Sequence, residues 1–167
     1  MRLLSDDKDF LGILDQHKRI IFKICNSYCR NPESRKDLVQ EVVIQLWKSY
    51  PKYDPQYKIS TWIYRIALNV AISFYRREEK FKRHNPVSEA LIVFKDDPES
   101  NDEVENNLRL LQAFINELKE IDKAIILLYL DDKPYREIAE ITGFTETNVA
   151  TKINRIKEKL RTNFLNQ

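Results

Sequence analysis

The chain has 167 residues, enough for one or two domains, and 43% of them are hydrophobic and 32% charged, as in soluble globular proteins. Its two glycines, Gly12 and Gly143, are too few for a hairpin-rich β fold or a glycine-rich phosphate loop. No apolar run is long enough to span a membrane, and the acidic N-terminus lacks the apolar core of a signal peptide. We therefore expect an all-α protein of the cytoplasm.

Charge is unevenly spread along the chain, although the net charge is only +2. Residues 1–84 carry 17 Lys and Arg against 10 Asp and Glu, residues 85–122 carry 3 against 10, and residues 123–167 carry 8 against 6. Two basic modules on an acidic tether would suit nucleic-acid binding at two places, although such asymmetry is also common in soluble proteins.

Two amphipathic helices are predicted at the start of the chain. Apolar residues recur at three- and four-residue steps over residues 6–30, and Asn31 and Pro32 then end this helix and begin the next. The second helix covers residues 33–50 and ends at Pro51.

A tyrosine-rich loop over residues 51–60 leads to a third helix, predicted over residues 61–82, with Ser60 or Thr61 as its N-cap. Periodicity is then lost over residues 84–104, where prolines and acidic residues indicate a linker with a short apolar run at 90–94. Four further helices are predicted over residues 105–118, 120–130, 134–141 and 145–163.

Residues 135–156 carry the spacing of a helix-turn-helix. Ala139 is small where the second helix would cross closely, and Gly143 stands at the turn, which requires a positive φ. Thr145 or Thr147 would cap the second helix. The residues that would lock the two helices together are Ile138, Ile141, Phe144, Val149, Ile153 and Ile156. The opposite face presents short polar groups and cations, which suits a recognition helix in the major groove, and a plain helical hairpin is the alternative.

Two motif blocks in the first half narrow the interpretation. Residues 37–47 read DLVQEVVIQLW, and residues 60–77 read STWIYRIALNVAISFYRR. Together they strongly resemble region 2 of the extracytoplasmic-function (group IV) sigma factors of bacterial RNA polymerase, which belong to the sigma-70 family. Residues 111–160 resemble region 4 of the same group. The two resemblances stand in the right order and leave out little more than the linker.

The resemblance implies an alternative sigma factor, which binds core RNA polymerase and directs promoter-specific initiation at −10 and −35 elements. It implies two small helical domains, region 2 over residues 1–84 and region 4 over residues 106–167, joined by a flexible acidic linker over 85–105. Partners would be core polymerase, duplex −35 DNA, single-stranded −10 DNA and an anti-sigma factor. We expect no cofactor, no bound metal, no catalysis and no direct membrane insertion.

The first block resembles the helix that grips the polymerase. The contacts implied there are Asp37, Gln40, Glu41, Gln45 and Trp47. An apolar stripe with an aromatic and an acid–amide edge is a reasonable surface for docking on another helix. The alternative for Trp47 is that it belongs to the core, where tryptophan is commonly found.

The loop and the second block resemble the element that melts and reads the −10 strand. The residues implied there are Tyr53, Tyr57, Lys58, Ser60, Trp62, Arg65, Asn69, Arg76 and Arg77. An unpaired base needs a stacking surface and hydrogen bonds to its edge, and cations hold its phosphates. Core packing is the alternative for Trp62, whereas an amide in the middle of a helix, such as Asn69, favours function.

In region 4 the resemblance implies −35 contacts by Ala150, Thr151, Asn154 and Arg155. The recognition-helix pattern adds Thr147, Asn148, Lys152 and Lys157. The position of Ala150 often carries a basic residue in the family, so −35 binding here would rest more on the cations that follow. The acidic linker would thread toward the RNA exit path of the polymerase.

Two other classes of function remain to be compared. A one-component helix-turn-helix regulator would explain residues 120–163 but not the two blocks of the first half. An enzyme is not indicated, since no metal-ligand cluster, nucleophile elbow or phosphate loop is visible. Cys25 and Cys29 lie one helical turn apart with His17 two turns earlier, and buried structural thiols explain them better than a metal site.

Overall fold

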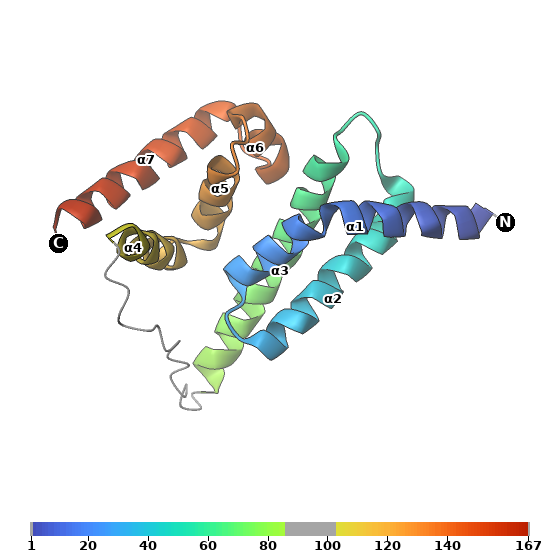
Figure 1. Ribbon diagram of the computed structural model, residues 1–167, viewed down its shortest axis with the longest axis horizontal. Helices are drawn as coiled ribbons and strands as arrows, with labels where there is room; N and C mark the ends of the chain where they lie inside the picture. The colour runs from blue at the N-terminus through green and yellow to red at the C-terminus, as the bar shows by residue number, and fades with distance from the viewer. Residues whose placement is uncertain (1, 86–102, 167) are drawn as a thin grey trace. The chain divides into compact units, whose positions relative to one another are not determined.

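The computed structural model describes residues 2–85 and 103–166, with side chains from residue 8 onward. Within these residues it contains seven α-helices and a short 3₁₀ turn and no β-strand, which confirms the all-α prediction (Figure 1). The apolar run at residues 90–94 and most of the expected acidic linker lie outside the described residues. The chain forms two compact units, built mainly from helices α1–α3 and from helices α4–α7.

The N-terminal unit packs three long helices. They are α1 (Arg2–Tyr28), α2 (Pro32–Ser49) and α3 (Ile59–His84), with the 3₁₀ turn η1 (Tyr50–Lys52) after α2. The predicted break between the first two helices is confirmed, because the Asn31 side-chain oxygen accepts hydrogen bonds from the backbone N–H groups of Glu33 and Ser34. Asn31 is therefore the N-cap of α2, and Pro32 occupies the first helical position, where a missing N–H costs nothing.

The core of this unit joins one stripe from each helix. It includes the fully buried side chains of Cys25, Leu38, Val42, Leu46, Ile63, Ala67 and Ala71. Cys25 and Cys29 are free buried thiols, as predicted. Burial raises the pKa of the Cys25 thiol to about 12, because the interior disfavours the thiolate, and the neighbouring Cys29 adds to the shift.

The start of α3 differs from the prediction. Helix α3 begins at Ile59, so Ser60 and Thr61 lie inside its first turn and do not cap it. The reason is tertiary: Thr61 faces the interior with only 1% of its surface exposed, and the Trp62 backbone N–H already bonds to the Lys58 carbonyl. Lys58 therefore stands at the N-cap position, and Ser60 and Thr61 lie too far into the helix to occupy it.

The C-terminal unit contains four shorter helices. They are α4 (Glu103–Glu117), α5 (Glu120–Leu130), α6 (Tyr135–Thr142) and α7 (Glu146–Leu165). Each begins and ends within two residues of its predicted bounds. Their core is formed by Phe114, Ile115, Ile126 and Ile156, with Leu111, Leu118, Leu127, Tyr129 and Leu160 packed around it.

The predicted helix-turn-helix is formed by α6 and α7. Gly143 has φ +80°, which an L side chain rarely adopts, and its N–H bonds to the Ala139 carbonyl. Thr145 caps α7, because its hydroxyl oxygen accepts the Asn148 N–H at 3.2 Å. Five of the six expected core residues are buried and Phe144 is half-buried. Ala139 is partly exposed, so its predicted place beneath the crossing helix does not fully shield it.

Candidate functional site

The outward face of α2 combines polar and apolar side chains. Asp37, Gln40 and Gln45 are exposed on it, and Glu41 is partly exposed. Ile44, which sequence reasoning missed, is 51% exposed. The signal was available, because Ile44 stands two residues out of step with the buried stripe of the same helix, and an isoleucine there must face outward.

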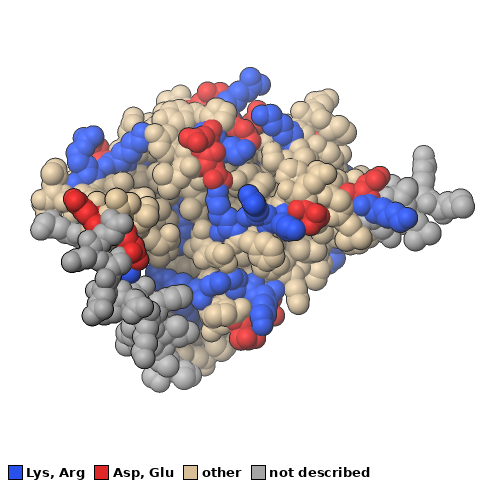
Figure 2. Space-filling view, in the orientation of Figure 1, with Lys and Arg blue, Asp and Glu red and all other residues tan. Residues whose placement is uncertain are grey.

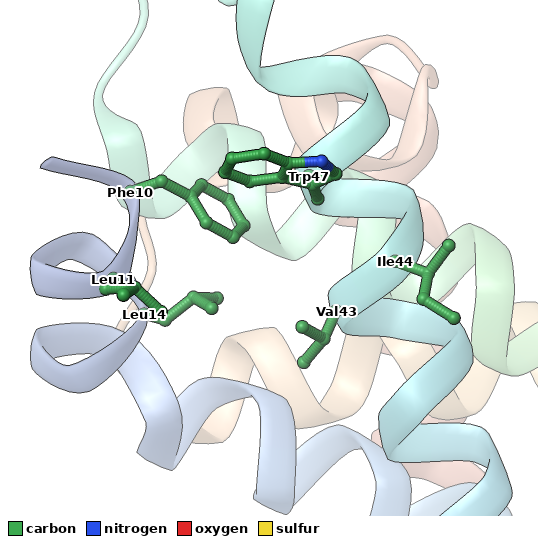
Figure 3. A pocket seen from close by; sticks show the side chains of 6 residues that line it. All are labelled: Phe10, Leu11, Leu14, Val43, Ile44 and Trp47. Atoms are coloured by element: carbon green, nitrogen blue, oxygen red, sulfur yellow. The ribbon is translucent and has the colours of Figure 1, made fainter. Parts of the chain in front are cut away.

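Trp47 lies on this face close to Ile44 and is 44% exposed, so it is not a core residue. Its indole meets the ring of Phe10 edge-on, with the ring centroids 5.0 Å apart. Beside it, α1 and α2 enclose an open apolar groove of about 360 Å³ (Figure 3). The groove is lined by Phe10, Leu11, Leu14, Val43, Ile44 and Trp47. Ile44 and Trp47 thus belong to the α2 face and to the groove together.

The loop between η1 and α3 is held in one shape by its own residues. Asp54, Pro55, Gln56 and Tyr57 form a turn in which the Tyr57 N–H bonds to the Asp54 carbonyl and the Gln56 N–H bonds to the Asp54 carboxylate. Aspartate first and proline second are the residues that such a turn favours. Across the turn, the Tyr53 hydroxyl donates to the Tyr57 carbonyl at 2.6 Å.

Aromatic rings connect this loop to the helices. The Trp62 ring lies 5.3 Å from the ring of Tyr53 and 6.2 Å from that of Tyr50, and it is only partly exposed. Tyr57 is 43% exposed, and the Arg65 guanidinium carbon lies 6.0 Å from its ring centroid. The loop therefore presents Tyr57 to solvent, while Tyr53 and Trp62 support it from behind.

A polar stripe runs along α3 from this loop. Arg65, Asn69 and Arg76 are exposed, and Ser73, which sequence reasoning did not select, is exposed between them. These residues recur at three- and four-residue steps, so they share one side of the helix. Lys58, just before α3, is exposed, and Ser60 is partly exposed. In the view of Figure 2, basic side chains stand out singly and in small groups among acidic ones.

Arg77 lies apart from this stripe, one residue further round the helix. Its Nη2 atom donates to both carboxylate oxygens of Glu41, at 2.8 and 3.0 Å. Its guanidinium carbon is also 5.6 Å from the ring centroid of Phe74. Arg76 and Arg77 are adjacent in the sequence but lie on different sides of α3. The structure also pairs Arg77, which is expected to bind DNA, with Glu41, which is expected to bind polymerase.

The outer face of α7 presents the predicted recognition residues. Thr147, Asn148, Thr151, Asn154 and Arg155 are exposed, and Ala150 is partly exposed. The Thr151 hydroxyl bonds to the Thr147 carbonyl one turn earlier. This face is therefore made of short polar groups that end in a long cation.

The two lysines of this helix are held by α5. Lys152 Nζ lies 3.0 Å from Asp122 Oδ1. Lys157 Nζ lies 2.7 Å from the Tyr129 hydroxyl and 4.4 Å from the centroid of its ring. The hydrogen bond to Tyr129 is the main cause that raises the pKa of Lys157. Both lysines are partly buried between the helices and contribute to the joint between α5 and α7.

Within the described ranges, no three His, Cys, Asp or Glu side chains converge as metal ligands would. No helix there has the length and apolarity needed to cross a membrane.

Comparisons with known proteins give two family matches, one in each compact unit of the chain. The Sigma-70 region 2 family matches residues 13–81, and the Sigma-70, region 4 family matches residues 108–160. The ECF RNA polymerase sigma factor SigW of Bacillus subtilis is 27% identical, covering 94% of this chain and 89% of the relative. The RNA polymerase sigma factor SigV of the same organism is 28% identical, covering 89% of this chain and 86% of the relative.

Two solved structures share the fold. CnrH, solved in complex with the cytosolic domain of CnrY, has a TM-score of 0.67 at 18% identity and covers 95% of this chain and 88% of its own. The sigma factor RpoE of Bartonella quintana, solved in complex with the anti-sigma factor NepR, has a TM-score of 0.67 at 19% identity and covers 93% of this chain and 96% of its own. With both family regions present in order, the chain belongs to the sigma-70 family as an alternative sigma factor of the extracytoplasmic-function group, which directs promoter-specific initiation of transcription.

Proposed function

We propose that this sigma factor divides its work among three surfaces, each on a different helix face. The α2 face binds core RNA polymerase, the loop and outer stripe of α3 bind the unpaired −10 strand, and α7 reads the −35 duplex. The single observation that carries this proposal is the exposed stripe of α3, in which Arg65, Asn69, Ser73 and Arg76 continue from the exposed ring of Tyr57.

The α2 face has the composition of a protein-binding surface. Ile44 and Trp47 form an exposed apolar centre, and Asp37, Gln40 and Gln45 form a polar rim. Interfaces concentrate their binding energy in such centres, especially at tryptophan, while the polar rim contributes specificity. We assign this face to the polymerase, with the adjoining groove as its apolar extension.

The loop and α3 suit a single strand. The exposed Tyr57 ring provides a stacking surface that any base can use, and the Asn69 amide can both donate to and accept from a base edge. Arg65 and Arg76 lie on the same side of α3 and can neutralise phosphates. The proposed base-binding surface is supported from below by three less exposed residues, Tyr53, Ser60 and Trp62.

The outer face of α7 suits duplex DNA. Asn148, Thr151 and Asn154 are short polar groups that reach base edges in the major groove, and Arg155 can contact a guanine or a phosphate. Ala150 offers a methyl group for contact with thymine. Lys157 adds positive charge from a position held by the Tyr129 hydroxyl, and Lys152 would have to leave Asp122 to contact a phosphate.

We further propose region 2 over residues 1–84, a linker over 85–105 and region 4 over 106–167. We place the protein in the cytoplasm and assign it no enzymatic activity. An anti-sigma factor is a proposed partner, and the two similar structures, each solved in complex with another protein, support it.

Run-off transcription with core polymerase on a library of genomic fragments tests the proposal. We expect transcripts that require both the core enzyme and this protein, from templates that share two spaced elements. Trp47→Ala should lower affinity for core polymerase at least tenfold, by the loss typical of a central tryptophan. Phe22→Ala is the matched control, because Phe22 is also a large exposed aromatic residue but lies off the α2 face.

A one-component regulator predicts a different pattern. Such a protein would bind specific duplex DNA without polymerase and would not associate with the core enzyme. Duplex binding together with no core association would therefore replace the sigma-factor assignment.

A further inference from the structure

The pair formed by Glu41 and Arg77 connects two surfaces that serve different partners. Glu41 lies on α2, one turn after Asp37 and one turn before Gln45, within the face proposed to bind polymerase. Arg77 follows Arg76 on α3 and lies one residue further round the helix than the stripe proposed to bind DNA. The contact joins residues 36 positions apart in the chain through two hydrogen bonds from one nitrogen.

The pair is easily opened. The Arg77 and Glu41 side chains keep 62% and 43% of their surfaces exposed, so water can replace either partner. Exposed ion pairs of this kind contribute little to stability and respond to nearby charge. This contact contributes little to the fold, yet it neutralises one charge on the polymerase-binding face and one charge next to the DNA-binding stripe, which suits a regulatory role.

We propose that the Glu41–Arg77 pair couples polymerase binding to DNA binding, an inference that rests on the proposed function. In the free protein, the Glu41 carboxylate neutralises Arg77 and weakens its attraction for phosphate. A basic group of the polymerase that engages Glu41 releases Arg77 toward the DNA backbone. Once released, the long Arg77 side chain can change rotamer toward a phosphate held by Arg76, the residue before it.

The coupling must act in both directions. If polymerase binding raises the affinity for DNA by some factor, DNA binding raises the affinity for polymerase by the same factor. The strength of an exposed pair limits this factor to about twofold to fivefold. The pair would therefore disfavour DNA binding by the free sigma factor without preventing it.

A double-mutant cycle tests the proposal in the full-length protein. The four proteins are the wild type, Glu41→Gln, Arg77→Gln and the double variant, and the probe is a short single-stranded oligonucleotide of mixed sequence at low salt. Glu41→Gln should raise the affinity of the free protein for this probe about twofold to fivefold. The same substitution in the Arg77→Gln background should have a much smaller effect, because the released arginine is then missing.

Glu33→Gln is the matched control, since Glu33 is another carboxylate of α2 in an exposed ion pair, with Lys36 at 3.6 Å. It removes the same charge without releasing Arg77 and should change affinity for the probe less than Glu41→Gln does. Equal effects of Glu41→Gln in both backgrounds, or equal effects of the two glutamate substitutions, would overturn the coupling.

Core polymerase provides the second measurement. Saturating core should reduce the difference in probe binding between the wild type and Glu41→Gln, because polymerase already occupies Glu41 in the wild type. A wild-type protein that fails to bind core contradicts the proposed function as a whole. A protein that binds core but shows an additive cycle contradicts the coupling alone.

Discussion

Lys152 of α7 forms an ion pair with Asp122 of α5, with Nζ 3.0 Å from Oδ1 and both side chains largely shielded from solvent. The residues are 30 positions apart, so the contact connects α7 to α5. Lys152 also lies 5.5 Å from the ring centroid of Phe144, at the turn of the helix-turn-helix. This lysine therefore supports the helix that carries the predicted recognition residues.

We expect Lys152→Ala to lower the free energy of unfolding by about 1 kcal/mol, because it leaves a shielded Asp122 without its cation. Urea unfolding of the full-length chain, followed by circular dichroism, measures the change. Asp122→Asn in the Lys152→Ala background should recover part of the loss. An unchanged unfolding midpoint in Lys152→Ala would show that the pair does not hold the two helices.

Arg155 should behave differently, since it is exposed on the outer face of α7. We expect Arg155→Ala to weaken duplex binding by the holoenzyme and to reduce the dependence of log affinity on log salt by about one unit, as the loss of one phosphate contact does. Binding titrations at several salt concentrations give this slope. If Arg155 instead contacts the edge of a guanine, Arg155→Ala should lose discrimination at that one base pair of the site. The dependence of log affinity on log salt should then stay the same.

The two glycines should respond in opposite directions to alanine. Gly143 has φ +80° and open space where a Cβ would lie, so Gly143→Ala costs only backbone strain, about 1–2 kcal/mol. Gly12 is inside α1 with equally open space, so Gly12→Ala should stabilise by about 0.5–1 kcal/mol. Thermal unfolding of the two variants beside the wild type checks both signs. A stabilising Gly143→Ala would mean that the turn accepts another backbone conformation.

Cys25 predicts a dependence of stability on alkaline pH. Its pKa is about 12 in the folded chain against an ordinary value of 9.0, so above pH 9 the unfolded chain loses this proton while the folded chain keeps it. Fewer protons on the unfolded state mean that stability falls as pH rises, by up to about 1.4 kcal/mol per pH unit in this window. Unfolding measured from about pH 8 to about pH 10 should show a steeper fall in the wild type than in Cys25→Ala. Parallel curves would contradict the assignment.

Local signals account for the parts of the structure that were predicted correctly. Asn31 and Pro32 specify a helix end and start through their own chemistry, and Gly143 specifies a turn because other residues avoid its φ. The cap of α3 was wrong because burial of Thr61 overrides its local preference.

Contacts between segments far apart in the chain could not be predicted from the sequence. The pairing of Glu41 with Arg77, and that of Lys152 with Asp122, depend on which helix faces meet, and no local pattern encodes this. Ile44 is an intermediate case. Its outward position follows from the period of α2, but its importance becomes visible only once Trp47 and the groove are placed beside it.

The positions of the two tryptophans have a practical consequence for fluorescence spectroscopy. Trp47 and Trp62 are the only tryptophans of the sequence, and both lie in the N-terminal unit, each within a ring contact of its neighbours. Tryptophan fluorescence of the native protein therefore reports on this unit, and the C-terminal unit contributes no tryptophan emission. Under the proposed assignment of surfaces, polymerase binding near Trp47 and base binding near Trp62 should each change this emission in an unlabelled sample.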